Sequence, residues 1–219
     1  MSIARSPVPI DAILPTVARP ARYTAGEWNA RAKPWDATTI HLALAYPDIY
    51  DVGMSNLGFH ILYEIANAIP DVLCDRVYAP WPDMEAAMRQ HALPLYGLES
   101  RRPLAAFDLI GFTLPYELNL TNVLNMLDLA GLPIQARRRD GRCPFIVAGG
   151  VGAYNAEPMV DFLDLVVLGD GEEVLVELLN VYRDWKKHAA PDAPREEFLV
   201  EAARLPGIYA PALYRAVYD

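Results

Sequence analysis

Five short apolar segments, four of them followed by a stretch with helical spacing, constrain the fold of this chain more than any other feature of its sequence. The segments are residues 40–46, 75–79, 107–113, 144–148 and 162–168. Apolar runs of this length, bounded by turn residues, are typical of strands buried on both faces. Their alternation with helices predicts an α/β fold with a doubly wound parallel five-stranded sheet, for which the flavodoxin-like order 2-1-3-4-5 is the natural expectation.

The predicted helices are marked by caps and by apolar residues at helical spacing. Ser55 or Asn56 is expected to cap a helix that continues to Ile69, and the sequence PWPD at 80–83 opens the next one. Two further helices are predicted over residues 120–130 and 174–187.

The 219 residues suit one α/β domain with additional segments at both ends. We expect an N-terminal arm over residues 1–38, a central α/β domain over 39–188 and a connector over 189–219. The N-terminus lacks the apolar core of a signal peptide, and no stretch reaches the ~18 apolar residues of a membrane-spanning helix. A cytoplasmic location without membrane contact is therefore expected.

Composition excludes several kinds of site. Two cysteines, Cys74 and Cys143, cannot build a four-cysteine zinc site or an all-cysteine iron–sulfur cluster, and we expect both thiols to be reduced. The acidic balance of 28 Asp and Glu against 19 Lys and Arg argues against nucleic-acid binding by this chain. We predict no metal-ligating residues.

Most of the unusual residues directly follow the predicted strands. In a doubly wound sheet, ligands bind beyond the carboxyl ends of the strands, where the strand order reverses. The corresponding loops are residues 47–58, 113–119, 149–157 and 169–172. They contain several glycines, which let a backbone approach a ligand closely, so we expect a flat ligand across this edge.

Familiar nucleotide-binding and nucleophile motifs are incomplete in these loops. Gly53 and Gly58 have the spacing of a phosphate-binding P-loop, but Phe59 and His60 stand where that loop needs Lys and Ser or Thr. The sequence GGVG at 149–152 does not continue into a dinucleotide fingerprint, and no Gly-x-Ser-x-Gly sequence is present.

An ordered series of motifs resembles the N-terminal, cobalamin-binding-like region of a family of bacterial radical S-adenosylmethionine (radical SAM) proteins. The motifs are RYTAGEWN (22–29), YPDIYDVGMSNLG (46–58), APWPDME (79–85), LESRRPL (98–104), GFTLPYEL (111–118), TNVLNMLD (121–128), AGG (148–150), NAEP (155–158) and GDGEE (169–173). Individually most are weak, but together they span nearly the whole chain in order.

The resemblance implies a flavodoxin-like domain that holds cobalamin against a radical SAM barrel. That barrel would be the partner of this chain, in cis or in trans. It would carry the [4Fe-4S] cluster and S-adenosylmethionine beyond residue 219, with residues 189–219 as the connector. The parent protein would then be a radical SAM enzyme, whereas this chain alone is expected not to be catalytic.

One departure from related domains concerns the cobalt ligand. Many cobalamin domains carry Asp-x-His-x-x-Gly after the first strand, and the histidine ligates cobalt. When the motifs are aligned on Gly58, Ser55 stands at the histidine position and Gly53 at the aspartate position. Either cobalamin binds without a protein ligand to cobalt, or the domain has lost cobalamin.

The expected cofactor contacts all lie in the four loops. The candidates are Gly53, Gly149 and Gly150 for close backbone approach, Asn56, Thr113 and Asn155 for polar contacts, and in addition Asp48, Ser55, Gly58, Tyr116, Glu117, Glu157, Gly169 and Gly171.

Three functions stay open from the sequence. The leading hypothesis is an accessory domain of a radical SAM enzyme, with cobalamin as its small-molecule cofactor. The alternative is a scaffold or docking module that has lost cobalamin and contacts the barrel, the substrate or a partner protein through aromatic residues such as Tyr46, Tyr50, Trp81 and Tyr116.

The third function is that of an independent enzyme in which Glu117 and Glu157 act as acid–base groups. Carboxylates in such loops otherwise cap helices or pair with arginines, and no nucleophile or metal cluster supports this hypothesis.

Overall fold

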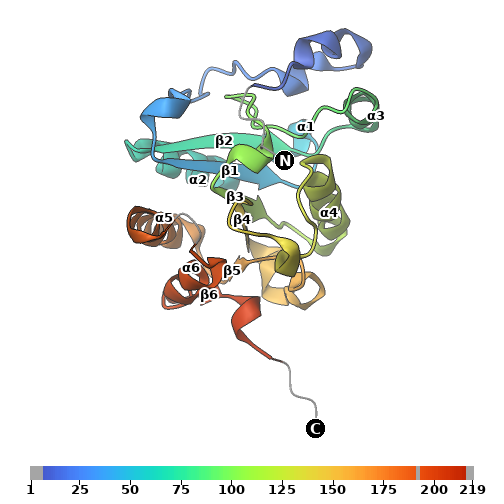
Figure 1. Cartoon of the computed structure of the whole chain (residues 1–219). Helices are drawn as coiled ribbons and strands as arrows, with labels where there is room; N and C mark the ends of the chain where they lie inside the picture. Colours follow the sequence, from blue (N-terminus) through green and yellow to red (C-terminus); the bar gives the residue numbers. More distant parts are fainter. Residues whose placement is uncertain (1–6, 191–192, 216–219) are drawn as a thin grey trace.

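A six-stranded sheet with the order β2-β1-β3-β4-β5-β6 forms the centre of the molecule (Figure 1). The computed structural model describes residues 7–190 and 193–215, so parts of the predicted arm and connector lie outside the described residues. Strands β1 to β5 are parallel, and β6 pairs with β5 in the antiparallel direction. The strands are β1 Ile40–Tyr46, β2 Val72–Tyr78, β3 Leu109–Thr113, β4 Phe145–Gly149, β5 Leu165–Val167 and β6 Ile208–Tyr209.

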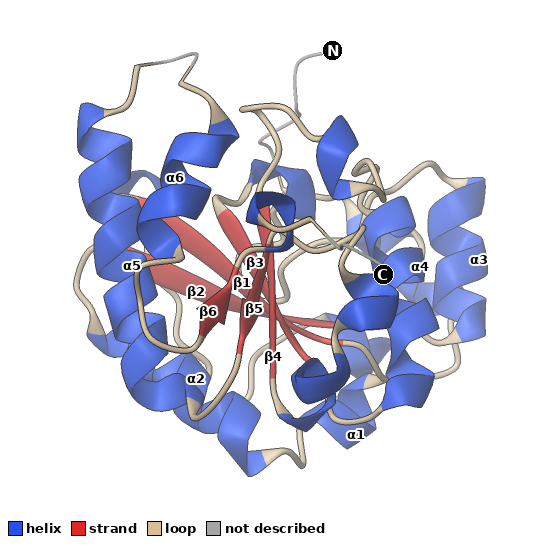
Figure 2. Ribbon diagram, turned by 90° about the horizontal axis from the view of Figure 1, so that it is seen from below, coloured by secondary structure: helices blue, strands red, loops and turns tan. Residues whose placement is uncertain are grey.

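Helices cover both faces of this sheet (Figure 2). They are α1 Tyr50–Gly53, α2 Leu57–Ala68, α3 Pro82–Gln90, α4 Leu120–Leu129, α5 Gly171–His188 and α6 Arg195–Ala202. Figure 2 shows α2, α5 and α6 on one face and α3 and α4 on the other, in agreement with two separate apolar cores. Among the described residues, no helix is long and apolar enough to cross a membrane.

The flavodoxin-like fold class and the strand order predicted from the sequence are confirmed. Strand β1 lies between β2 and β3, with Leu42 opposite both Cys74 and Leu109. The connection from β1 to β2 contains α2, on one face, whereas the connection from β2 to β3 contains α3, on the other (Figure 2). The strand order therefore reverses at β1 and β3, and a crevice is expected beyond their carboxyl ends.

The sheet has one strand more than the five that the sequence predicts. The added strand, β6, contains only two residues and follows a turn at Gly207. Gly207 has a φ of +79°, and a Cβ there would lie 2.5 Å from the carbonyl oxygen of Leu168. Only glycine permits this turn, which brings the chain back along β5.

The segment before β1 packs against the α3 side of the sheet. It forms short 3-10 helices over Ile10–Ala12, Leu14–Thr16, Pro20–Tyr23 and Trp35–Ala37. Two of its apolar side chains, Ile10 and Ile13, are fully buried in the same core as Met84 and Met88. The described part of this segment is therefore an integral layer of the domain.

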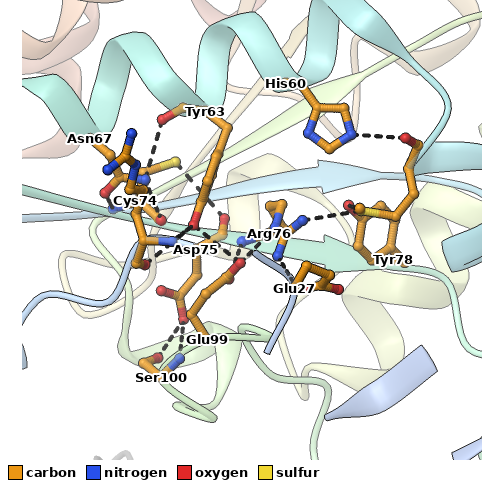
Figure 3. Close-up of polar contacts among 12 residues, drawn as sticks. Glu27, His60, Tyr63, Asn67, Cys74, Asp75, Arg76, Tyr78, Glu99 and Ser100 are labelled. Atoms are coloured by element: carbon orange, nitrogen blue, oxygen red, sulfur yellow. Dashed lines mark hydrogen bonds and ion pairs between the residues drawn. The ribbon is translucent and has the colours of Figure 1, made fainter. Parts of the chain in front are cut away.

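A buried arginine joins this segment to the outer edge of the sheet (Figure 3). Arg76 lies in β2, and its guanidinium pairs with Glu27 at 2.7 Å and with Glu99 at 2.6 Å. The Glu99 carboxylate also accepts the backbone N–H of Arg76 at 2.8 Å. Tyr50 donates a hydrogen bond of 2.5 Å to Glu27, which links the segment to α1.

A further carboxyl, Asp75, lies beside this network and is almost completely buried. Its carboxylate accepts hydrogen bonds from the backbone N–H of Ser100 at 2.9 Å and from the Ser100 hydroxyl at 2.5 Å. Burial, followed by repulsion from the Glu99 charge, raises the pKa of Asp75 to about 7. Burial of the Glu99 carboxyl likewise raises the pKa of Glu99.

We predict that this buried carboxyl makes the stability of the domain depend on pH near neutrality. Because the pKa of Asp75 is raised in the folded state, the folded state binds the proton more tightly than the unfolded state does. The free energy of unfolding should therefore fall, by about 1–3 kcal/mol, as pH rises from 5 to 8. Urea unfolding across this range measures the slope.

The variant Asp75→Asn should remove most of that slope and be more stable than the native chain at pH 8. Its amide oxygen still accepts from Ser100, so the packing is kept. The exposed Asp161→Asn serves as the control and should leave the slope unchanged. An unaltered slope in Asp75→Asn would assign the pH dependence to other groups.

Candidate functional site

A cavity of about 520 Å³ opens at the carboxyl ends of the strands and extends between the sheet and helices α2 and α5. Its sheet wall is apolar and comprises Leu42, Leu44, Leu109, Gly111 and Val147. Its helix wall is equally apolar and comprises Leu62, Val174, Leu175, Leu178 and Leu179. We call this inner part, bounded by these ten residues, the slot.

The entrance to the slot is more polar than the slot itself. Its polar side chains are Asn56, Thr113, Tyr154, Asp170 and Glu172. They stand at the end of β3, in the segments after β1, β4 and β5, or in the first turn of α5. The site therefore changes from a polar entrance to an apolar interior over the length of the strands.

The charges around the entrance are acidic. Asp170 and Glu172 lie beside the N-terminal end of α5, whose unpaired N–H groups carry partial positive charge. Among the described residues that line the cavity, none is a Lys, an Arg or a His. A ligand with a terminal phosphate would therefore find no cation in this site to balance its charge.

The loop between β1 and α2 is shaped by a helix cap. Asn56 is the N-cap of α2, and its side chain accepts the N–H of Phe59 at 2.9 Å. Two residues on, a Cβ at Gly58 would meet only the Asn56 oxygen, at 3.6 Å, so this position faces open space at the entrance. Ser55 donates to the carbonyl of Val52 at 2.7 Å and does not line the cavity.

In the loop after β4, Gly150 and Gly152 pack closely against Leu114, which directly follows β3. Gly150 has a φ of +95°, and a Cβ there would lie 2.9 Å from the carbonyl oxygen of Leu114. Leu114 is held from both sides, because its N–H donates to Gly149 and its carbonyl accepts from Gly152. Gly149 itself has room for a methyl group and borders the cavity.

Half of the residues that the sequence nominated as cofactor contacts meet at this cavity. Those that line it are Asn56, Gly58, Thr113, Gly149, Gly150, Gly169 and Gly171. Those that do not line it are Asp48, Gly53, Ser55, Tyr116, Glu117, Asn155 and Glu157. Their role as ligand contacts stays a prediction in both groups.

The candidate cofactor contacts that lie outside the cavity are packed, hydrogen-bonded or exposed elsewhere. A Cβ at Gly53 would overlap the ring of Tyr78, so packing accounts for this glycine. Asp48 accepts the N–H of Ile49 at 2.7 Å and lies 3.5 Å from the Tyr116 hydroxyl. Glu117, Asn155 and Glu157 are exposed.

The slot could not be predicted from the sequence, because its residues have the pattern of an ordinary packed core. Leu42, Leu109 and Val147 belong to buried strands, and Leu178 and Leu179 to the apolar face of a helix. Nothing in their spacing distinguishes a wall of a cavity from a packed interior. The exposed apolar residues at the entrance, Val151 and Tyr154, lay within a nominated loop but were not singled out.

No histidine takes part in the site. His60 bonds through Nε2 to the carbonyl of Met54 at 2.9 Å, and His41 lies at the opposite end of β1 beside Asp108. His91 and His188 follow α3 and end α5, respectively. Within residues 7–190 and 193–215, no group of three or more His, Cys, Asp or Glu could hold a metal ion.

Replacement by alanine should have opposite effects on stability at two glycines of the first loop. We predict that Gly53→Ala destabilises the domain by about 1–3 kcal/mol, because the Cβ overlaps Tyr78. Gly58→Ala should be neutral or stabilise by up to about 1 kcal/mol, because it lies in the first turn of α2 with free space around it. Chemical denaturation of both variants measures this difference, and equal effects would contradict it.

Comparison with known protein families finds a family whose sequence pattern matches most of this chain. Residues 58–211, more than half of the chain, match the family described as radical SAM proteins, N-terminal. No curated protein matches the chain. The matched region begins at Gly58, at the entrance of the cavity, and extends beyond β6.

Proposed function

Because the chain belongs to the family of radical SAM proteins, as their N-terminal region, we propose that it is an accessory ligand-binding domain whose ligand is cobalamin. The reaction centre would lie in a radical SAM barrel that carries the [4Fe-4S] cluster and S-adenosylmethionine. The present chain would bind and orient the cofactor for that barrel, in cis or in trans.

The observation that carries this proposal is the distribution of lining residues along the cavity. A more polar entrance at the strand ends leads into an apolar slot between the sheet and helices α2 and α5. Cobalamin has a corresponding division, since an amide-bearing corrin ring carries a nucleotide tail that ends in an apolar dimethylbenzimidazole. The slot would receive this aromatic base, and the corrin would cover the entrance.

The residues at the entrance fit the polar parts of such a ligand. Asn56 and Thr113 offer hydrogen-bonding side chains, and the corrin amides are suitable partners for them. Gly58 and Gly169 have open space where a side chain would otherwise stand, so a flat ring can approach the backbone there. The single charge of the tail phosphodiester would lie nearest the positive end of α5.

Other ligands of flavodoxin-like folds fit this site less well. A flavin mononucleotide or a nucleoside triphosphate brings a terminal phosphate with two or more charges. Such groups need cations or a ring of donors, whereas the charged side chains of this site are Asp170 and Glu172. The acidic entrance therefore favours a ligand whose polar groups are mostly neutral amides.

The protein would leave the lower face of cobalt without a ligand of its own. Ser55 stands at the position of the histidine in related domains, and its hydroxyl is bonded to Val52. Insertion of the benzimidazole into the slot would at the same time remove it from cobalt. A bound cobalamin would supply a cobalt ion that can carry an alkyl group, and this chain's residues would hold and shield it.

A second candidate function is a docking module without a cofactor. The observation that favours it is a set of exposed apolar side chains near the entrance, Leu57, Leu118, Val151 and Tyr154. Of the aromatic residues nominated for docking, Tyr46 is buried, whereas Trp81 and Tyr116 are about half exposed. A barrel or partner protein would cover such a surface whether or not cobalamin is bound.

We predict that the chain binds hydroxocobalamin and that a side chain at Gly58 blocks binding. Gly58→Phe adds a ring at a position that lines the entrance and has open space around its Cβ, and it should weaken binding at least tenfold. Gly141→Phe is the matched control, because Gly141 also has free space but lies outside the cavity. Equilibrium dialysis of each variant at increasing hydroxocobalamin concentration measures the dissociation constant.

Failure of the native chain to retain cobalamin would overturn the cofactor assignment. If the chain then bound a separately expressed barrel, the docking function would replace it. Equal weakening in Gly58→Phe and Gly141→Phe would show that the cavity is not the binding site.

A second prediction concerns the environment of cobalt. Electron paramagnetic resonance of the cobalamin complex, reduced to Co(II), should show no splitting from an axial nitrogen, because neither a histidine nor the benzimidazole would ligate cobalt. The variant His60→Ala should have the same spectrum, since this ring is bonded to Met54. Nitrogen splitting would contradict insertion of the base into the slot.

A further inference from the structure

We infer, resting on the proposed cobalamin site, that the slot selects cobamides by their lower base: it accepts benzimidazole or phenol-type rings and rejects purines. Cobamides share the corrin ring and differ in the base that ends the nucleotide tail. That base is the part of the ligand that would enter the slot. The distribution of polar atoms along the cavity determines which of these bases the slot can take.

The polar side chains of the cavity are confined to its entrance. Thr113 ends β3, and Asp170 and Glu172 stand at the start of α5. From Thr113 down to Leu109, four strand residues correspond to about 13 Å without a polar side chain on the sheet wall. On the other wall, the apolar lining residues of α5 run from Val174 to Leu179, and these five residue steps correspond to about 8 Å.

The backbone groups of both walls are already paired. Strand β3 pairs on one side with β1 and on the other with β4, so its N–H and C=O groups bond within the sheet. Beyond its first turn, whose N–H groups lie at the entrance, the backbone of α5 is paired along the helix. Neither wall therefore offers a free donor or acceptor to a group that reaches the inner part of the slot.

A polar side chain further along α5, beyond the slot, already has a hydrogen-bond partner. Tyr182 lies one helical turn after Leu178, and its hydroxyl donates to Asp108 at 2.9 Å. The charge of Asp108 is at the same time balanced by Lys186 at 2.7 Å. These groups form a closed network beneath the slot, and Tyr182 does not line the cavity.

A purine base would lose hydrogen bonds on entering such a slot. The far edge of adenine carries an amino group and ring nitrogens, which in water are hydrogen-bonded. The corresponding edge of dimethylbenzimidazole carries two methyl groups, whose transfer from water into the slot lowers the free energy of binding. An unsatisfied buried polar group commonly weakens binding by about tenfold to a hundredfold, so we expect that range between the two cobamides.

The experiment compares four ligands on the full chain by equilibrium dialysis. Cobalamin and the cresolyl cobamide present bases without a polar far edge, whereas the adeninyl cobamide presents a purine. Cobinamide, which lacks the whole nucleotide tail, reports how much affinity the tail contributes. We expect cobalamin and the cresolyl cobamide to bind about 10- to 100-fold more tightly than the adeninyl cobamide, and more tightly than cobinamide.

Two variants of α5 test whether the wall itself is responsible. Leu175→Gln places an amide on the slot wall, and it should reduce the preference for cobalamin over the adeninyl cobamide at least threefold. Val176→Gln is the matched control, because Val176 is a neighbouring, partly buried residue that does not line the cavity. The control should keep the full preference.

The outcomes separate this inference from the proposed function. If cobalamin and the adeninyl cobamide bind within threefold of each other, or if cobinamide binds as tightly as cobalamin, selection by the slot is wrong while cobalamin binding stands. An unchanged preference in Leu175→Gln also counts against the slot. If none of the four ligands binds, the proposed function fails and the inference fails with it.

Discussion

Burial of the Arg76 guanidinium is the interaction on which the outer edge of the sheet depends. An arginine in a strand whose seven residues are all buried is tolerated only where carboxylates and hydrogen bonds replace its water. Glu99 supplies one carboxylate from the segment after α3, and Glu27 supplies the other from the segment before β1. Removing either partner would leave a buried charge uncompensated, so the N-terminal segment and the sheet edge are stabilised together. The same guanidinium lies 3.1 Å from the sulfur of Met54, directly after α1, and thus extends this anchoring to the loop that leads into the cavity.

The secondary structure could be predicted largely from local signals, because buried parallel strands leave continuous apolar runs and helix starts leave caps. The cap at Asn56 is an example, since its side chain accepts the hydrogen bond that its position suggested. Strand β6 shows the limit of this approach. Two residues carry no strand pattern, and their pairing with β5 depends on the turn at Gly207. The partners of Arg76 were equally out of reach, because Glu27 lies 49 residues away in the sequence and only the folded sheet brings them together.

The candidate site was predictable in its place but not in its form. Strand order alone indicates the carboxyl edge of β1 and β3, and half of the nominated residues meet there. The individual glycines carried less information. Gly53 is required by Tyr78 and Gly150 by Leu114, whereas Gly58 faces open space, and the three look alike in the sequence. The slot was invisible for a different reason. Its walls are leucines and valines that a packed core would also use, so a cavity appears only when the spacing of α2 and α5 from the sheet is known.

The apolar interior of this site can discriminate between ligands by shape and by the cost of burying polar atoms. Among the described residues that line the cavity, none is a Lys, an Arg or a His. Close contact between Gly171 and Leu62, where a Cβ would lie 3.1 Å from a methyl group, sets α5 against α2 beside the entrance. The walls of the slot therefore belong to elements that are packed against each other independently of any ligand. A preformed apolar slot gains affinity from every methyl group that leaves water and loses it for every polar atom that finds no partner. Specificity in such a domain would thus reside in the interior of the slot, while the polar entrance would orient the part of the ligand that faces the reaction centre.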